Sequence, residues 1–228
     1  MPCLIAIDGV DASGKQTHTN LLYERLKREG IRVRQISFPM YKSPSSEVVK
    51  MYLSGQFGEK PEDVDAYAAS TFFALDRYAT YRADWGSDYE SGTVILADRY
   101  VSSNMIHQAG KISDRAQKDR FLDWIYEFEY GVYHLPKPDA EIFLDMPVVH
   151  ALELMKNRTN KINGEAQKDI HERDAHFLQA SYENALYVAK KYHWLKINCV
   201  ENGAVRPFEE ISEEIYRAVI EKIRQKVN

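Results

Sequence analysis

The stretch Gly9-Val10-Asp11-Ala12-Ser13-Gly14-Lys15 (GVDASGK) decides the fold of this 228-residue chain. It follows a short apolar run, residues 4–7, and precedes residues 16–29, whose leucines fall at helical spacing. Glycines let such a loop curl so that its backbone N–H groups point inward at phosphate oxygens, and a lysine at its end reaches the β- and γ-phosphates. Because the motif stands between a predicted strand and a predicted helix, it indicates a phosphate-binding loop (P-loop) rather than an ordinary glycine turn.

The residue after Lys15 departs from the usual form of this loop. That position commonly holds Ser or Thr, whose hydroxyl binds Mg²⁺, but here it is Gln16, with Thr17 after it. Two interpretations stay open. Either Mg²⁺ takes its ligands from water and from carboxylates, with Asp8 and Asp11 nearby, or Gln16 contacts phosphate instead.

Strand-like and helical segments alternate along the rest of the chain. The predicted strands are residues 4–7, 33–38, 93–97, 140–144 and 194–198. The predicted helices are residues 16–29, 45–53, 63–84, 121–128, 148–155, 174–191 and 207–224. This alternation is typical of an α/β fold with a parallel sheet flanked by helices on both faces. Since no repeat or linker divides the chain, we expect one domain over residues 1–228.

Composition narrows the class of protein. The net charge of −4 argues against a nucleic-acid binder, which usually has a basic excess. The two cysteines, Cys3 and Cys199, are far apart and have no metal-binding spacing, which favours free thiols in a reducing compartment. No apolar run approaches a membrane span, and residues 1–8 do not resemble a signal peptide. We therefore expect a cytoplasmic protein that binds neither membranes nor nucleic acid.

Asp98 and Arg99 come directly after the strand predicted at residues 93–97. Ligands gather at the carboxyl ends of strands in open α/β sheets. A carboxylate there holds Mg²⁺ or its waters, and an arginine grips a phosphate with its planar guanidinium. The alternative is a surface ion pair, because Asp-Arg is a common dipeptide.

Two further segments have both a functional and a structural interpretation. Phe73 and Arg77 share one helix face, which would suit a base, although core packing by Phe72 and Phe73 is favoured by the pattern alone. The polar stretch at residues 156–168 carries Arg158 among several lysines. It is either a solvated loop or a mobile lid that brings a cation to a transferred phosphate.

With these segments in hand, the chain resembles the thymidylate kinases, which phosphorylate dTMP to dTDP, over nearly its whole length. The matching pieces follow the family's order. They are IDGVDASGKQT (residues 7–17), SFPMY (37–41), FFALDR (72–77), DRYVSSN (98–104) and KDIHE (168–172). The resemblance implies a P-loop nucleotide kinase fold with a lid at about residues 156–172, ATP as phosphate donor, Mg²⁺, and a homodimer.

The resemblance also implies roles for particular residues. ATP would lie on Gly9, Val10, Asp11, Ala12, Ser13, Gly14, Lys15, Gln16 and Thr17. dTMP would contact Phe38, Pro39, Tyr41, Phe73, Arg77, Arg99, Ser103, Asn104, His107 and Gln108, with Phe73 stacked on thymine. Magnesium would be held by Asp11 and Asp98, and the catalytic groups would be Lys15, Arg99, Asp11 and Arg158.

Two features differ from the common family pattern. His107 stands where an aromatic residue, often Tyr, is associated with excluding a ribose 2′-hydroxyl, so deoxyribose selectivity would change there. The P-loop has no arginine, and members of this kind tend to carry the catalytic cation in the lid. Arg158 is the leading candidate for that cation, followed by Arg173 and Lys168.

Two other functions compete with dTMP phosphorylation. One is a kinase for another pyrimidine nucleotide or nucleoside on the same scaffold. The other is a P-loop switch whose partner reads the bound nucleotide, although the sequence has no guanine-reading Asn-Lys-x-Asp.

Overall fold

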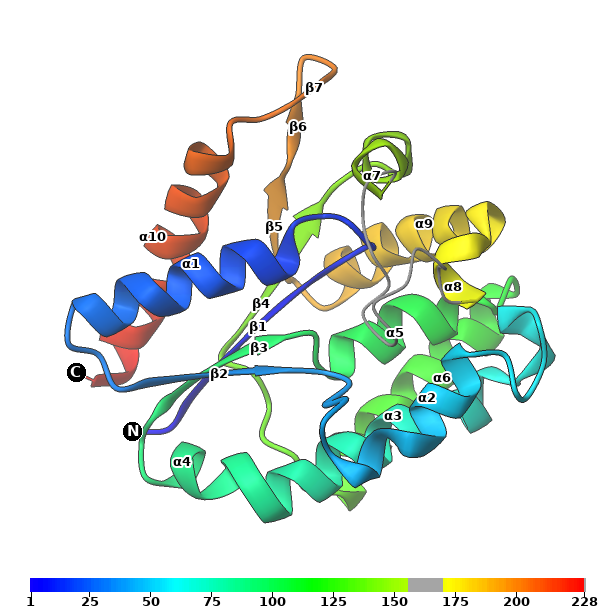
Figure 1. Ribbon diagram of the computed structural model, residues 1–228, viewed down its shortest axis with the longest axis horizontal. Coiled ribbons are helices and arrows are strands. Elements are labelled where there is room, and N and C mark those ends of the chain that lie inside the picture. Colours follow the sequence, from blue (N-terminus) through cyan, green and yellow to red (C-terminus); the bar gives the residue numbers. More distant parts are fainter. Residues whose placement is uncertain (156–169, 228) are drawn as a thin grey trace.

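The computed structural model describes residues 1–155 and 170–227. Within these residues, five parallel strands form one sheet (Figure 1) in the order β2-β3-β1-β4-β5. The strands are β1 (Cys3–Gly9), β2 (Val33–Ser37), β3 (Val94–Asp98), β4 (Ala140–Asp145) and β5 (Leu195–Asn198). All five lie where the sequence predicts them, and the expected fold class is confirmed.

The strand register brings the predicted motifs to one edge of the sheet. Ile7 of the central strand pairs with Asp98, and Gly9 pairs with Leu144. Ser37 of the edge strand β2 is also opposite Asp98. Because neighbouring parallel strands end together, the P-loop, the segment after Ser37 and the Asp98-Arg99 pair all leave the sheet at one place.

Helices cover both faces of the sheet (Figure 1). On one face, α1 (Lys15–Arg28) and α10 (Phe208–Val227) pack with the apolar side chains of β1 and β4 in one buried cluster. On the other face, a second cluster joins the sheet to α3 (Ala66–Thr80), α5 (Val101–Gly110), α6 (Arg115–Tyr126) and α9 (Ala175–Lys191). Residues 3–7 are buried throughout, as a strand covered on both faces requires.

The smaller elements lie around this frame. The short helices are α2 (Glu47–Leu53), α4 (Gly86–Glu90), α7 (Val148–Met155) and α8 (Ile170–Arg173). Two 3₁₀ turns, η1 (Pro44–Ser46) and η2 (Pro61–Asp63), flank α2. Two π-helical segments, η3 (Tyr81–Trp85) and η4 (Glu127–Val132), continue α3 and α6. A hairpin, β6 (Val200–Glu201) and β7 (Ala204–Val205), follows β5.

The predicted elements are incomplete in several places, among them α4, and α6 begins at Arg115 rather than at residue 121. The sequence predicts no helix over residues 101–110, where α5 lies, because α5 is buried almost all round and buries polar residues such as Asn104 and Gln108, so it has no single apolar stripe. The hairpin of β6 and β7 is also missing from the prediction, since its two-residue strands are too short to show alternation.

Most of the lid predicted at residues 156–172 lies outside the described residues. Only its last part, in α8, is described. In the part of the chain that the structure describes, no helix has the length and apolar content that a membrane crossing requires.

Candidate active site

The P-loop joins β1 to α1 through a tight backbone turn. Gly14 caps α1 in the left-handed conformation, with φ of 86°, and a Cβ at this position would lie 3.2 Å from the ring of His18. The first turn of α1 holds no acidic residue, so no carboxylate of the helix itself opposes its positive dipole end. This arrangement suits a phosphate.

Lys15 folds back over the loop that precedes it. Its Nζ donates hydrogen bonds to the carbonyl oxygens of Gly9, at 2.9 Å, and Val10, at 2.7 Å. Burial, followed by the nearby charge of Arg99, lowers the pKa of Lys15 to about 7. An anion at the loop would favour the charged form, so phosphate binding and protonation of Lys15 reinforce each other.

Asp8 anchors the end of β1 to the start of α5. The hydroxyl groups of Ser102 and Ser103 donate to its Oδ2, at 3.0 and 2.6 Å, and the N–H of Gly9 donates to its Oδ1, at 2.8 Å. These contacts satisfy a carboxylate that is fully buried. Asp8 therefore orients the P-loop against α5 rather than facing an open site.

Arg99 lies at the centre of the site. Its Nη2 donates to Asp11, and its Nη1 lies 3.0 Å from His107 Nε2 and 3.3 Å from Ser103 Oγ. Burial alone would raise the pKa of Asp11, but the charges of Arg99 and Lys15 outweigh it and hold that pKa well below its usual value. The alternative of a surface Asp98-Arg99 pair is wrong, because Arg99 pairs with Asp11 instead.

Asp98 has the chemistry of a magnesium ligand. It is buried, and its Oδ2 accepts a hydrogen bond from Ser37 Oγ at 3.4 Å, while its Oδ1 has no partner among the described residues. Asp98 lines a cavity of about 270 Å³ together with Asp11, Lys15 and Thr17. An orphaned carboxylate oxygen beside a phosphate loop fits Mg²⁺, which commonly binds one or two carboxylates and keeps several waters.

Gln16 is exposed and lines the same cavity. In the described residues, no group of three His, Cys, Asp or Glu side chains is placed to hold a metal ion. Water would then complete the ligand set, as one of the two interpretations of Gln16 expects. The other interpretation, a contact between Gln16 and phosphate, stays equally open.

A second cavity, of about 70 Å³, holds every residue predicted to contact dTMP. Its lining comprises Phe38, Pro39, Tyr41, Phe73, Arg77, Arg99, Ser103, Asn104, His107 and Gln108, and also Asp11, Leu53 and His171. We call it the acceptor cavity. The residues come from α2, α3, α5, α8 and the loops after β1, β2 and β3, so only the fold brings them together.

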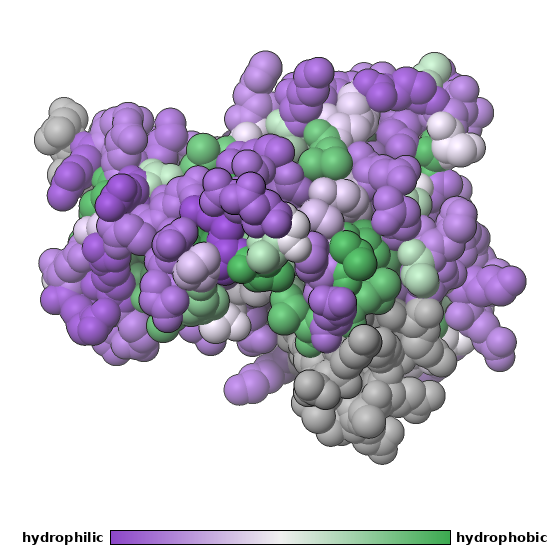
Figure 2. Space-filling view, turned by 90° about the horizontal axis from the view of Figure 1, so that it is seen from above, coloured by the Kyte–Doolittle hydropathy of each residue, from purple (hydrophilic) through white to green (hydrophobic). Residues whose placement is uncertain are grey.

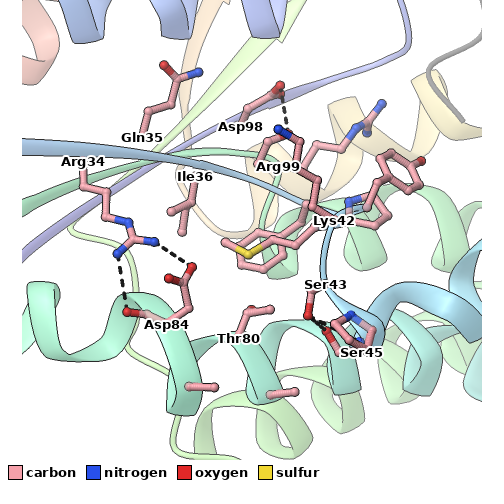
Figure 3. Close-up of a pocket in the computed structure, with 18 of the residues that line it drawn as sticks. Arg34, Gln35, Ile36, Lys42, Ser43, Ser45, Thr80, Asp84, Asp98 and Arg99 are labelled. Carbon is pink, nitrogen blue, oxygen red and sulfur yellow. Dashed lines mark hydrogen bonds and ion pairs between the residues drawn. The ribbon is translucent and has the colours of Figure 1, made fainter. Parts of the chain in front are cut away.

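The acceptor cavity adjoins a wider one of about 1060 Å³, shown in Figure 3. The two share Asp11, Phe38, Pro39, Tyr41 and Arg99. In Figure 3 the far wall carries Arg34, whose guanidinium is paired with Asp84 at 2.6 Å. The acceptor cavity thus opens into a broad space beside the edge strand β2.

Figure 2 shows a mostly hydrophilic surface in which hydrophobic residues form separate patches.

The two phenylalanines of α3 differ in their surroundings. Phe72 and Phe73 both pack against the small buried cluster formed by Val49, Tyr52 and Leu53, as the core interpretation expects. Phe73 also lines the acceptor cavity. Its ring is therefore placed for both roles.

Glu129 is a site residue that the sequence interpretation misses. It is fully buried and accepts hydrogen bonds from Nε and Nη2 of Arg77, each at 2.6 Å. It also accepts one from Asn104 Nδ2 at 3.0 Å. The i, i+4 series Phe121, Ile125, Glu129 was the available signal, because it places a carboxylate on the buried face of α6 and its continuation.

A second missed cluster lies at the rim of the acceptor cavity. Tyr52 Oη is 2.9 Å from His171 Nε2, and Lys111 Nζ donates to Tyr52 Oη at 2.9 Å and to the carbonyl of Val64 at 3.0 Å. Burial lowers the pKa of Lys111 to about 8. These contacts tie α2, the end of α5 and α8 together.

Part of the predicted catalytic set cannot be placed. Arg158, the leading candidate for the lid cation, and Lys168 lie outside the described residues. Arg173 is the last residue of α8. The choice between these cations stays a prediction.

A comparison with protein-family models identifies the chain. The model described as thymidylate kinase matches residues 7–215. The chain belongs to the thymidylate kinase family. As the resemblance predicts, this thymidylate kinase homologue is a phosphotransferase that phosphorylates dTMP to dTDP.

Individual thymidylate kinases are similar over most of the chain. The thymidylate kinase of Mycobacterium tuberculosis (strain ATCC 25618 / H37Rv) is 34% identical over 77% of this chain and 80% of its own length. The probable thymidylate kinase 1 of Saccharolobus solfataricus is 30% identical over 82% of this chain and 88% of its own. The thymidylate kinase of Plasmodium falciparum is 25% identical over 94% of this chain and 88% of its own length.

Proposed function

We propose that this protein transfers the γ-phosphate of ATP to dTMP across the junction of two cavities. One is the cavity of about 270 Å³ lined by Asp98, Lys15 and Thr17, which we call the P-loop cavity, and the other is the acceptor cavity. The observation that carries the proposal is that Asp11 and Arg99 line both the P-loop cavity and the acceptor cavity. A phosphate donor in one and a phosphate acceptor in the other would meet at these two side chains. Holding two reactants in this way supplies much of the rate enhancement in phosphoryl transfer.

On the donor side, the loop from Gly9 to Thr17 holds the ATP phosphates. Its N–H groups and the start of α1 face the anion, and Lys15 turns from the loop carbonyls to the β- and γ-phosphates. Asp98, with Asp11 nearby, would hold Mg²⁺. The ion, when bound, neutralises charge on the β- and γ-phosphates.

On the acceptor side, Phe73 stacks on thymine while Arg77 and Asn104 hydrogen-bond its edge. Arg99 binds the phosphate of dTMP, and Asp11 holds the guanidinium in position. The attacking oxygen is already anionic, so no strong general base is required. Catalysis then rests on positioning and on the positive charge of Lys15, Arg99 and a lid cation, for which Arg158 is proposed.

The remaining expectations complete the proposal. We propose one domain over residues 1–228 with a lid at about residues 156–172, a homodimer, and a cytoplasmic location without nucleic-acid or membrane partners. The buried, unpaired state of Cys3 and Cys199 supports a reducing compartment. Exposed apolar side chains on α3 and η4, including Tyr67, Leu75 and Val132, support a helix-mediated dimer.

A kinase for another pyrimidine nucleotide is the main alternative. His107 bears on this alternative through the sugar of the acceptor. It contacts Arg99 and lines the acceptor cavity at the position where the family often has Tyr, which is associated with excluding a ribose 2′-hydroxyl. A P-loop switch has less support, since a switch does not need an acceptor cavity that joins the phosphate loop.

The test is an acceptor assay with the purified protein, ATP and Mg²⁺. We expect rapid formation of dTDP and ADP from dTMP, slower reactions with dUMP and dCMP, and none with thymidine. ADP is measured by a coupled assay and each product by chromatography. ATP binding without phosphate transfer to any acceptor would support the switch, and a preference for another acceptor would support the alternative kinase.

A further inference from the structure

Glu129 sits behind the base end of the acceptor cavity and contacts two of the residues that line it. Its carboxylate forms a paired interaction with Arg77, through Nε and Nη2 at 2.6 Å each. The same carboxylate accepts a hydrogen bond from Asn104 Nδ2 at 3.0 Å. Glu129 is fully buried and does not itself line the cavity. It therefore acts on a ligand only through Arg77 and Asn104.

The amide of Asn104 has one permitted orientation. Its Nδ2 donates to Glu129 Oε1 and, at 3.1 Å, to the carbonyl oxygen of Ser70. Both partners are acceptors, so a flipped amide would place an oxygen against two oxygens and lose both bonds. Asn104 Oδ1 has no hydrogen-bond partner in the part of the chain that the structure describes, and Asn104 lines the acceptor cavity. The amide thus offers an acceptor to a ligand.

Arg77 offers the opposite polarity. Two of its five N–H groups are used by Glu129, and the others can only donate. Burial lowers the pKa of Arg77, but the charge and hydrogen bonds of Glu129 outweigh this, and the net pKa is raised. The guanidinium therefore stays charged beside the cavity. A ligand edge in contact with both residues meets a donor next to an acceptor.

This pattern matches one class of pyrimidine. Thymine and uracil present an acceptor at O4 and a donor at N3–H, whereas cytosine presents a donor at N4 and an acceptor at N3. A site built from fixed hydrogen-bonding groups rejects an analogue of the wrong polarity strongly, because buried groups are then left unpaired. Stacking on Phe73 cannot make this distinction, since every base has a π-face.

We propose that Glu129 is the positioning residue that selects a 4-oxo over a 4-amino pyrimidine, by fixing Arg77 as a donor and Asn104 as an acceptor at the base. The inference rests on the proposed function, because it assumes that a pyrimidine nucleotide occupies the acceptor cavity. It explains how the cavity tells dTMP from dCMP without a contact from Glu129 to either.

The main test compares Glu129→Gln with Glu127→Gln. Glutamine replaces one of the two acceptor oxygens by an amide donor. That donor faces either Arg77 Nε or both Arg77 Nη2 and Asn104 Nδ2, so the arrangement that fixes Arg77 and Asn104 is broken on one side or the other. Glu127 is the matched control, since it is on the same π-helical segment, is exposed, and undergoes the same change of charge. The measurement is kcat/KM for dTMP divided by kcat/KM for dCMP, with KM and kcat determined separately.

We expect the dTMP/dCMP ratio to fall at least about tenfold in Glu129→Gln, mainly through a higher KM for dTMP, and to stay at the wild-type value in Glu127→Gln. Glu129→Asp keeps the carboxylate and should give an intermediate ratio. An unchanged ratio in a folded, active Glu129→Gln variant would overturn the inference. A wild-type enzyme that does not phosphorylate dTMP would instead remove the proposed function.

A binding measurement on the wild-type enzyme covers the case in which the variants do not fold. dTMP, dCMP and N3-methyl-dTMP are titrated into the protein by calorimetry. The methyl group removes the N3–H donor while the O4 acceptor stays, so we expect dCMP and N3-methyl-dTMP each to bind about tenfold or more weakly than dTMP. Equal binding of dTMP and dCMP would overturn the inference.

Discussion

At the scale of single residues, Arg99 and Asp11 determine how the site is used. Arg99 contacts Asp11, Ser103 and His107 at once, so its guanidinium is already oriented toward the junction of the two cavities. A preoriented charge costs little reorganisation when negative charge develops during transfer. Asp11 thus holds Arg99 in place, in addition to its proposed role beside Mg²⁺.

The first prediction concerns Lys15. We expect Lys15→Ala to lower kcat by about 10²–10³-fold, because it removes a preorganised positive charge from the transferred phosphate. Turnover is measured by ADP release with dTMP as acceptor. Lys27→Ala, on the exposed side of the same helix, is the control and should retain wild-type turnover. A normal rate for Lys15→Ala would remove the proposed mechanism.

Residues in sequence motifs were the easiest to predict. The P-loop and Asp98-Arg99 can be recognised from the local sequence, because the curvature of a glycine-rich loop and the end of a strand determine where these residues lie. Glu129 was missed because its importance depends on Arg77 and Asn104, which lie 52 and 25 residues away in the chain. A buried carboxylate acquires its role from such distant partners, and helical spacing shows only which face it occupies.

At the scale of elements, α5 connects the parts of the site. Its first turn supplies Ser102 and Ser103 to Asp8, its middle supplies Asn104 and His107 to the acceptor cavity, and its end leads to Lys111. This helix was not predicted, whereas all five strands were. Strands in a parallel sheet are continuous apolar runs, but a helix that buries polar functional groups conceals its own pattern.

The second prediction concerns the start of α9. Asp174 accepts hydrogen bonds from the N–H groups of His176 and Phe177, both at 2.9 Å, and so caps the helix. We expect Asp174→Ala to lower the free energy of unfolding by about 1 kcal/mol and the Tm by about 2–4 °C. Asp174→Asn preserves the cap and should lie close to wild type in thermal unfolding. Equal stability of Asp174→Ala and wild type would exclude a capping role.

At the scale of the whole molecule, the third prediction concerns the proposed homodimer. Leu75 on α3 and Leu21 on α1 are each 45% exposed, so they form a matched pair. We expect Leu75→Glu to convert the dimer to a monomer, because a buried charge at an apolar interface is costly. Leu21→Glu should leave the mass unchanged in light scattering. If both variants remain dimers, the interface does not involve Leu75 of α3.

The fourth prediction concerns acid stability. Burial lowers the pKa of His18 to about 4. Burial and the positive charge of Arg99 lower the pKa of His107 to about 4. Burial also holds the pKa of His171 well below its usual value. Unfolded histidine takes up a proton near pH 6.5, but the folded side chains do so only at lower pH. Stability should therefore fall as pH decreases from 6.5 to 4, by up to about 1.4 kcal/mol per pH unit for each histidine.

His18 allows a direct test, because it lies outside the acceptor cavity, stacked on Phe208 and bonded to Ser212. Urea unfolding of His18→Gln is measured at pH 7, 6 and 5. We expect the stability of this variant to depend less on pH than that of wild type, by about 1 kcal/mol per pH unit below pH 6. His176→Gln, an exposed control, should behave as wild type. The same pH slope in all three would contradict the prediction.

The two cavities share Asp11 and Arg99, and this has a consequence for how the substrates bind. With ATP in one cavity and dTMP in the other, as proposed, each nucleotide changes the charge around the same two side chains that the other nucleotide meets. The affinities for ATP and dTMP are then energetically coupled. By thermodynamic linkage, ATP must change the affinity for dTMP by the same factor by which dTMP changes the affinity for ATP.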